Sequence, residues 1–337
     1  MIQRVIKFVL SNKTLRKKAV ETLKKVNTNA FDVSKLKVFD TFTDELSNKV
    51  DLKEGLRSMV KPGWQSTFEN KPIGKLANKD IGIKAKDVSG FINTMIQFLS
   101  KFTHKEFQEV LEVGSYDTIK STILASKWKN SKVMSGDVDY YFENSQIEQI
   151  RENRKLIQSY FGVSNLSFEQ HDITESHYRE NQFDLTFSAD VLEHVSDIQK
   201  CFEELYRITK KGGFGYHVYN PFFSYNGGHT YATLDFPWGH ASLSKSDFEK
   251  YLKKYRPSEF EKASNFYLNS LNRCSLKEMD QHIKNSGFQI HAILKETKFN
   301  QLKMISSNTL SMVQRLYPSV TIDDLLSPIV TIIIEKK

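Results

Sequence analysis

Short apolar runs alternate with amphipathic segments from about residue 91 to the end of the chain. The amphipathic segments carry apolar residues at helical spacing, and the connections between the two kinds of segment are short. This alternation predicts a mostly parallel sheet that helices cover on both faces. The expected strands are 107–113, 131–139, 166–172, 183–189, 214–220, 288–296 and 328–337, and the expected helices are 91–102, 118–128, 145–162, 196–213 and 275–287.

The expected helix 196–213 has the clearest boundaries in the sequence. Ser196 and Gln199 have the spacing of a capping box at its start. Lys210 and Lys211 would occupy its last turn, where positive charge complements the helix dipole. Two glycines follow and would end the helix before the fifth strand.

The loop after the first expected strand places a ligand at one edge of the sheet. Residues 106–128 read EFQEVLEVGSYDTIKSTILASKW, a strand, a single glycine and a helix. Ligands of open parallel sheets bind at the carboxyl ends of the strands, near the point where strand order reverses. A dinucleotide needs three glycines there, but Gly114 is followed by Ser115, Tyr116 and Asp117. An NAD-linked oxidoreductase is therefore disfavoured.

Acidic side chains mark the ends of three successive strands at this edge. Glu112 lies two residues before Gly114, at the end of the first strand. Asp137 ends the second strand, where a carboxylate can accept both hydroxyls of a ribose, and Asp139 is a rival for that role. Asp172 ends the third strand, where a side chain can reach an adenine amine.

In this order and spacing, the motifs resemble the class I S-adenosylmethionine-dependent methyltransferases, in particular the group whose fourth strand leads into LEHV. The resemblance covers roughly residues 105–337 and rests on LEVGS, SGDVD, EQHDITE, FDLTFSADVLEHVSDIQKCFEELYRITKKGG and SLKEMDQHIKNSGF. It implies a doubly wound α/β fold with a seven-stranded, mostly parallel Rossmann-like sheet and an antiparallel last strand. S-adenosylmethionine carries no phosphate, so one tight turn with polar groups suffices for its methionine end.

The resemblance also implies how the cofactor is held. Glu112, Gly114 and Ser115 would bind the methionine end, and Asp137 would bind the ribose. Asp172 and Ile173 would contact the adenine. The floor below the sulfonium would be formed by Ser188, Ala189 and Asp190. A structural alternative for Glu112 is that its carboxylate only satisfies buried amides of the loop.

The sequence divides into an N-terminal extension, 1–95, and a methyltransferase domain, 96–337, with an insertion at about 221–273 after the fifth strand. The extension begins with a basic amphipathic helix. Residues 2–25 could touch a membrane surface. A signal peptide is disfavoured, because Arg4 and Lys7 interrupt the apolar run and no cleavage site follows. The two cysteines form no CxxC pair, which fits a reducing compartment. We therefore expect a cytoplasmic protein, and the sequence leaves its oligomeric state open.

The insertion carries the candidates for acceptor chemistry. A hydroxyl acceptor must lose its proton. A general base can remove it, or a bound metal can lower the pKa of the hydroxyl. His229 or His240 could be that base or, with Asp235, ligate a metal, although both could simply hold the turns of a packed loop. His194, in LEHV, is a further catalytic candidate, and it and Glu193 are more often structural. We assign no metal site from the sequence.

The predicted function is O-methylation of a small molecule or a glycan building block, because the insertion and LNRCSLKEM resemble methyltransferases that act on sugars or related metabolites. The expected contacts with the acceptor come from Tyr225, Asp235, Trp238, Asn272 and Arg273. The fourth strand lacks the turn by which amino-directed nucleic-acid methyltransferases hold a base, so nucleic acid is a disfavoured partner. An RNA-modifying enzyme and a non-catalytic module that binds the cofactor or a membrane surface remain alternatives. The net charge of +8 does not separate them.

Overall fold

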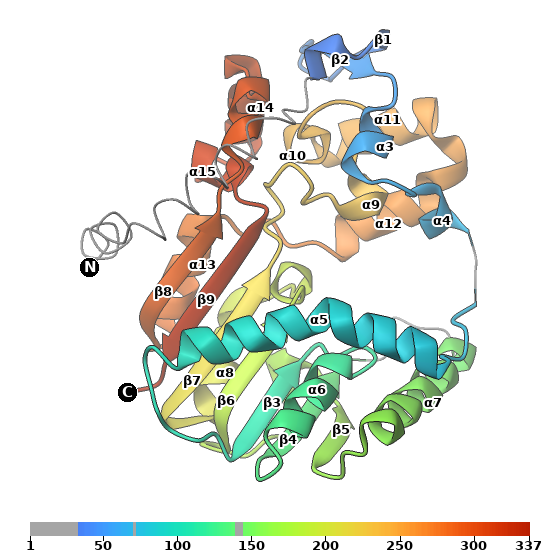
Figure 1. Cartoon of the computed structure of the whole chain (residues 1–337). Coiled ribbons are helices and arrows are strands. Elements are labelled where there is room, and N and C mark those ends of the chain that lie inside the picture. Colours follow the sequence, from blue (N-terminus) through green and yellow to red (C-terminus); the bar gives the residue numbers. More distant parts are fainter. Residues whose placement is uncertain (1–32, 70–71, 139–143) are drawn as a thin grey trace, which may run out of the picture.

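The structure, a computed structural model, describes residues 33–69, 72–138 and 144–337 (Figure 1). The basic helix expected at residues 2–25 and the rival ribose ligand Asp139 lie outside the described residues. Among the helices that are described, none is long and apolar enough to cross a membrane.

Seven strands form the central sheet in the order β5-β4-β3-β6-β7-β9-β8 (Figure 1). All neighbours are parallel except at β9, which runs antiparallel to both β7 and β8. The predicted fold class, including the antiparallel last strand, is confirmed. The strands are β3 (Glu109–Val113), β4 (Lys132–Asp137), β5 (Leu166–Gln170), β6 (Phe183–Ala189), β7 (Thr209–Tyr219), β8 (Gln289–Glu296) and β9 (Ile329–Glu335).

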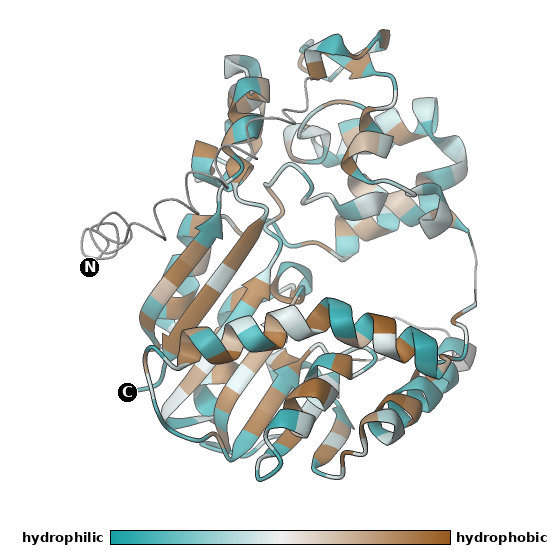
Figure 2. Ribbon diagram, viewed as in Figure 1, coloured by the Kyte–Doolittle hydropathy of each residue, from teal (hydrophilic) through white to brown (hydrophobic). Residues whose placement is uncertain are grey.

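Strand order reverses at β3, which lies between β4 and β6. The carboxyl ends of these three strands therefore form the edge at which a ligand of such a sheet binds. Burial explains the continuous apolar sequence of the central strands, since every residue of β6 is buried. Figure 2 shows the same contrast in colour, with β9 hydrophobic over most of its length and α5 hydrophobic only in patches.

Helices cover both faces of the sheet. On one face, α5 packs beside α6, and α6 beside α7, over a core that includes Ile92, Ile123 and Ile157. On the other face, α8 and α13 pack together over a core that includes Phe202 and Ile283. The bounds are α5 (Asn78–Leu99), α6 (Ile119–Lys127), α7 (Asn144–Phe161), α8 (Ile198–Ile208) and α13 (Leu276–Asn285).

The helix expected at 196–213 differs from the prediction at both ends. Asp197, not Ser196, caps α8, and its side chain accepts a hydrogen bond from the Lys200 amide at 2.9 Å. The helix ends at Ile208, and the segment that contains Lys210 and Lys211 begins β7 instead. Pairing of this segment with β6 and with the end of β9 outweighs the local helix signals.

A second layer, which we call the cap, lies above the carboxyl ends of the parallel strands (Figure 1). It has its own buried core, in which Phe42 and Leu52 pack with the aromatic residues of the insertion. The cap contains β1 (Val38–Thr43), β2 (Lys49–Lys53), α3 (Leu56–Val60), α4 (Gln65–Phe68), α9 (His229–Ala232), α10 (Gly239–Ser242), α11 (Lys245–Tyr255), α12 (Phe260–Asn269), α14 (Ser307–Leu316) and α15 (Ile322–Leu326). Short 3-10 helices are η1 (Val33–Lys35), η2 (Ile173–Glu175), η3 (Leu192–His194), η4 (Pro257–Glu259) and η5 (Phe299–Met304).

The cap joins segments that the predicted domain limits kept apart. Residues 33–68 of the extension pack on the insertion, and a buried bidentate ion pair between Arg57 and Glu259 holds them together with N–O distances of 2.8 Å. The predicted limit at residue 95 falls inside α5, which packs on the sheet. The segment that follows β8 also contributes helices to the cap.

Candidate functional site

The loop after β3 is built around Gly114. Its φ is +68°, and a Cβ at this position would lie 2.3 Å from a methyl group of Val191. The Gly114 and Ser115 amides donate to the Gly136 carbonyl at 2.9 and 3.0 Å, which ties this loop to β4. Only glycine has both the backbone freedom and the small volume that this turn requires.

In the loop that follows Gly114, two further residues adopt left-handed backbone conformations, although neither is a glycine. Tyr116 has φ +47° and Thr118 has φ +64°. Each such conformation costs a non-glycine residue about 1–2 kcal/mol. The single-glycine loop thus achieves its shape through strain at positions where the sequence offers no glycine, and such strain is common at ligand sites.

Glu112 is fully buried beneath this loop. One carboxylate oxygen accepts a hydrogen bond from the Ser121 amide in α6 at 3.0 Å, and the other has no partner among the described residues. Burial raises the pKa of Glu112 to about 7. The carboxylate therefore anchors α6 through one oxygen, and its other oxygen has no partner among the described residues.

Asp137 and Asp172 lie at the ends of β4 and just beyond β5. Asp137 accepts hydrogen bonds from the amides of Tyr116 and Val138. Asp172 accepts from the amide and the hydroxyl of Thr174, both at 2.8 Å. Both carboxylates are half-buried and shape the loops at the edge where the sequence placed the ribose and adenine.

The predicted floor lies at the end of β6. The Ser188 hydroxyl is hydrogen-bonded to Nδ1 of His217 at 2.9 Å, and both residues are fully buried. Burial lowers the pKa of His217 to about 3, so this imidazole is neutral. Asp190 has φ +60° and accepts a hydrogen bond from the Asn220 side chain at 2.7 Å.

Three residues beyond Asp190, a cluster of Glu193, His194 and His229 joins the sheet edge to the cap. Glu193 and His194 belong to η3, and His229 begins α9. Each residue offers one nitrogen or oxygen atom, and the three atoms lie within 4.8 Å of one another. The structure thus brings together two predicted catalytic histidines and Glu193, for which a structural role was the preferred prediction.

The cluster contains polar atoms that are buried without partners. Glu193 is 1% exposed, and one of its oxygens has no partner among the described residues. Nε2 of His229 is buried in the same way. Burial raises the pKa of Glu193 to about 8 and lowers that of His229 to about 3.

Two further candidates of the insertion lie outside this cluster. His240 is fully buried and donates from Nε2 to the Phe222 carbonyl at 2.8 Å, so it holds a turn of the cap. Asp235 accepts a hydrogen bond from the Tyr251 hydroxyl. The carboxylate beside His229 is therefore Glu193 and not Asp235, which corrects the predicted pairing of Asp235 with the histidines.

Most of the residues predicted to contact the acceptor make contacts within the protein instead. Trp238 and Tyr225 are buried against each other with ring centroids 5.0 Å apart, and the Trp238 indole donates to a backbone carbonyl. The Asn272 side chain donates to the carbonyls of Leu192 and Val195 at 2.6 and 2.9 Å. Asn272 thus clamps η3 in place, a role that only the folded chain reveals.

Two cations lie near the histidines of the cap. The Arg273 guanidinium lies over the rings of Phe222 and Tyr267 and donates to backbone carbonyls, and no carboxylate among the described residues pairs with it. Lys61 is half-buried, and its charge contributes to the lowered pKa of His229 and of His240. No sequence pattern pointed to Lys61, because its position depends on the packing of the extension onto the insertion.

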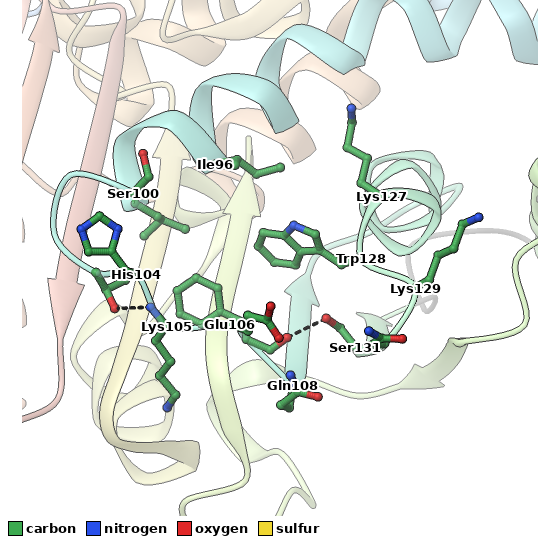
Figure 3. A pocket seen from close by; sticks show the side chains of 14 residues that line it. Ile96, Ser100, His104, Lys105, Glu106, Gln108, Lys127, Trp128, Lys129 and Ser131 are labelled. Carbon is green, nitrogen blue, oxygen red and sulfur yellow. Dashed lines mark hydrogen bonds between the residues drawn. The ribbon is translucent and has the colours of Figure 1, made fainter.

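A cavity of 520 Å³ lies at the opposite end of the sheet (Figure 3). Its lining includes Phe107 and Gln108, which precede β3, and Ser131, which precedes β4. Trp128 and Ile96 also border it, and Lys105, Lys127 and Lys129 lie around it (Figure 3). Because it is at the amino ends of the strands, this cavity is separate from the candidate site.

Comparison with known proteins identifies the domain. Residues 111–216 match the family model described as a methyltransferase domain. Phosphoethanolamine N-methyltransferase 1 of Arabidopsis thaliana is 27% identical over 126 residues, which cover 37% of this chain and 23% of that protein. The matched segment thus spans about a quarter of that relative.

Solved structures of methyltransferases are similar at low sequence identity. Phosphoethanolamine N-methyltransferase 2 of Haemonchus contortus is 18% identical with a TM-score of 0.44, covering 86% of this chain and 62% of that one. Geranyl diphosphate C-methyltransferase of Streptomyces coelicolor is 10% identical with a TM-score of 0.44, covering 81% and 87%.

Residues 111–216 of the chain therefore form a methyltransferase domain. The sequence-based prediction of an S-adenosylmethionine-dependent methyltransferase is confirmed for this domain. The residues assigned to the cofactor and to the acceptor stay predictions, with the positions described above.

Proposed function

We propose that the enzyme transfers the methyl group of S-adenosylmethionine to a hydroxyl of a small polar acceptor, such as a sugar or a related metabolite. The observation that carries this proposal is the cluster of Glu193, His194 and His229 between the sheet edge and the cap. The Asn220 side chain donates both to Glu193 and to Asp190 of the predicted floor. The cluster is therefore next to the place where the sulfonium would lie.

Methyl transfer is a displacement at a carbon bonded to cationic sulfur, so orientation and exclusion of water supply much of the catalysis. A hydroxyl acceptor must also lose a proton. His229 stays neutral at pH 7, but an imidazole whose pKa is about 3 is a weak proton acceptor by itself. We infer that the cluster activates the acceptor as a unit and not through one histidine.

The charges around the cluster favour an acceptor with an anionic group. Lys61 and Arg273 approach the histidines, and neither forms an ion pair with any of the described carboxylates. A carboxylate or a phosphate on the acceptor would supply the missing negative charge, and a guanidinium can bind it in a bidentate manner.

Activity is tested by transfer of labelled methyl groups from S-adenosylmethionine to sugars, sugar phosphates and nucleotide sugars. His229→Ala should lower turnover by about 100-fold or more, the range for loss of an acid–base group, while cofactor affinity stays within about threefold. His177→Ala, at an exposed histidine, is the matched control. Normal turnover of His229→Ala on the acceptor that the wild-type enzyme uses would reject the role of the cluster.

The proposed cofactor contacts are tested separately by calorimetric titration with S-adenosylhomocysteine. Asp137→Ala should weaken binding about tenfold or more, because a charge-assisted hydrogen bond is worth roughly 1.5–3 kcal/mol. Asp139→Ala is the control, since Asp139 is the rival ribose ligand. Loss of affinity in Asp139→Ala alone would transfer the ribose role to that residue.

N-methylation of a small phosphorylated amine is the second candidate. It is supported by the match of 126 residues to a phosphoethanolamine N-methyltransferase, and Lys61 and Arg273 would then hold the phosphate. Small amines in the same assay decide between the two, because the product carries the methyl group on nitrogen or on oxygen. The RNA alternative predicts binding of mixed RNA that weakens steeply with salt.

A further inference from the structure

We propose that Glu193, His194 and His229 bind one divalent transition-metal ion, with Zn²⁺ as the probe of choice. The inference rests on the proposed function for its catalytic meaning, but the binding itself does not depend on that function. Two imidazoles and one carboxylate are a ligand set found in catalytic zinc sites, where a fourth position stays open. Imidazole ligands favour zinc and its neighbours in the first transition row over magnesium.

The distances between the three ligand atoms would allow them to bind one metal ion after the side chains move slightly closer together. One ligand atom from each residue lies within 4.8 Å of the other two. Ligand atoms of a tetrahedral zinc ion are roughly 3.4 Å apart, as metal–ligand lengths of about 2.1 Å require. His229 is on a helix of only four residues, so a side-chain adjustment of about an ångström disturbs little regular structure.

The contacts around the cluster hold two of the ligands as a metal site needs them. Nδ1 of His194 donates to the Ser270 carbonyl at 2.6 Å, which leaves Nε2 as the nitrogen with a free lone pair. One oxygen of Glu193 accepts from the amide and the side chain of Asn220. The other Glu193 oxygen keeps its lone pairs. Histidine ligands of metals usually donate their second nitrogen to a carbonyl or a carboxylate in this way.

The second, independent observation in favour of a metal is a buried carboxylate oxygen that has no hydrogen-bond partner among the described residues. Glu193 is 1% exposed, and its second oxygen has no partner among the described residues. Buried carboxylates are normally paired with a cation or bound to a metal, because desolvation of an isolated charge is costly. No described Lys or Arg forms an ion pair with Glu193, so a metal ion would supply the positive charge that this pocket lacks.

Positive charge near the cluster works against a metal and must be offset. Lys61 lowers the pKa of His229 through its charge, so it lies within electrostatic reach of the site. The charge of Asp190 has the opposite effect, because it raises the pKa of Glu193 and of His194. Asp190 is exposed at the same edge of the sheet. A metal ion binds the deprotonated carboxylate, so its binding would displace the proton from Glu193 and would have to overcome repulsion from Lys61.

The open position of the metal would take the oxygen of the acceptor. A hydroxyl bound there has a lowered pKa and releases its proton to water. The oxygen then forms a bond to the methyl carbon while the carbon–sulfur bond breaks. The electron pair of the broken bond stays on sulfur. The products are the methylated acceptor and neutral S-adenosylhomocysteine. A metal bound here would allow a site without a strong base to remove the proton.

Metal binding is tested on the full-length protein after treatment with a chelator. Zn²⁺ is titrated against a chromophoric competitor, and Co²⁺ is added in a parallel sample because its visible absorption reports coordination by nitrogen and oxygen. We expect one equivalent of Zn²⁺ per chain and no comparable binding of Mg²⁺. Glu193→Gln and His229→Ala should each weaken Zn²⁺ binding by at least about 100-fold, since even supporting contacts contribute 10–100-fold.

His177→Ala and His282→Ala are the controls, because these histidines lie outside the cluster and would remove only adventitious binding. Folding of each variant is checked by its melting temperature and by its affinity for S-adenosylhomocysteine, which should be unchanged. Zn²⁺ affinity that is the same in wild type, Glu193→Gln and His229→Ala would overturn the metal site. Full methyl transfer by chelated enzyme would reject the catalytic role of the metal and leave the proposed function intact.

Discussion

Gly114 shows how much one residue can fix at the ligand edge. The turn after β3 needs a positive φ, and the neighbouring Val191 leaves no room for a Cβ. Val191 precedes η3, so the loop after β3 and the segment that carries Glu193 are in contact through this one position. Substitution here should disturb both the cofactor loop and the cluster.

Gly114→Ala should remove measurable binding of S-adenosylhomocysteine and lower stability by about 2 kcal/mol or more, from left-handed strain plus overpacking. Gly162→Ala separates the two effects, because Gly162 also has a positive φ but nothing lies within 4 Å of its Cβ position. The Gly162→Ala variant should lose about 1–2 kcal/mol of stability and keep the wild-type affinity for S-adenosylhomocysteine. Calorimetry and thermal melting measure both, and wild-type affinity in Gly114→Ala would contradict the steric argument.

His217 makes stability depend on pH. Its pKa is lowered to about 3 in the folded protein by burial, from an ordinary value near 6.5. The unfolded chain therefore takes up a proton below pH 6.5 that the folded chain refuses. The contribution to stability is complete above pH 6.5 and is lost as the pH falls toward 3.

His217→Asn should flatten this loss of stability between pH 6.5 and 4.5, although it costs some packing at pH 7. Removal of one titrating group changes the slope by at most about 1.4 kcal/mol per pH unit. Urea unfolding at several pH values gives the slope, and His177→Ala, at an exposed site, should leave it unchanged. Equal slopes in wild type and His217→Asn would mean that His217 can be protonated in the folded state.

At the scale of elements, a buried ion network joins the extension to the insertion. Glu259 accepts from Arg57 at 2.8 Å through both oxygens and from Arg256 at 2.6 and 2.9 Å. All three residues are less than 9% exposed, and the Arg57 guanidinium also lies over the Trp64 ring. The network connects α3 to η4 across 202 positions of sequence.

Glu259→Gln should destabilise the protein by about 3–5 kcal/mol, because two buried arginines would lose their counter-charge. Asp280→Asn, which breaks the surface pair with Lys284 in α13, should cost less than about 1 kcal/mol. Denaturant unfolding measures both variants. A small effect of Glu259→Gln would show that water or another acid replaces the lost charge.

At the scale of the whole molecule, the sheet carries the edge predicted to bind the cofactor, and the cap lies above it (Figure 1). The cap is made from three segments that are distant in sequence, 33–68, 221–272 and 299–326. Because the candidate cluster takes two residues from the sheet edge and one from the cap, it exists only when both layers are folded and packed.

Ligands of the cofactor edge should therefore stabilise the whole fold. S-adenosylhomocysteine at 100 times its Kd should add about 2.7 kcal/mol and raise the melting temperature by a few degrees. NADH should have no effect, since the loop after β3 lacks the glycines that a pyrophosphate requires. Thermal melts with each ligand measure this, and stabilisation by NADH alone would contradict the assigned cofactor.

The sequence by itself predicted the strands and helices of the sheet and the single-glycine loop, and its resemblance to class I methyltransferases implied the antiparallel last strand and the class of cofactor. These features are local: the periodicity of apolar residues and a glycine with a positive φ depend on neighbours along the chain. The end of α8 was missed because strand pairing with β6 and β9 overrides local helix signals.

Only the tertiary structure decided which polar residues form the site. The sequence could not tell His229, which meets Glu193 and His194, from His240, which meets a backbone carbonyl. It could not show that Asn272 clamps η3 or that Lys61 approaches the histidines. The partner of a buried polar group is chosen by packing between segments far apart in the chain, and no local pattern records that choice.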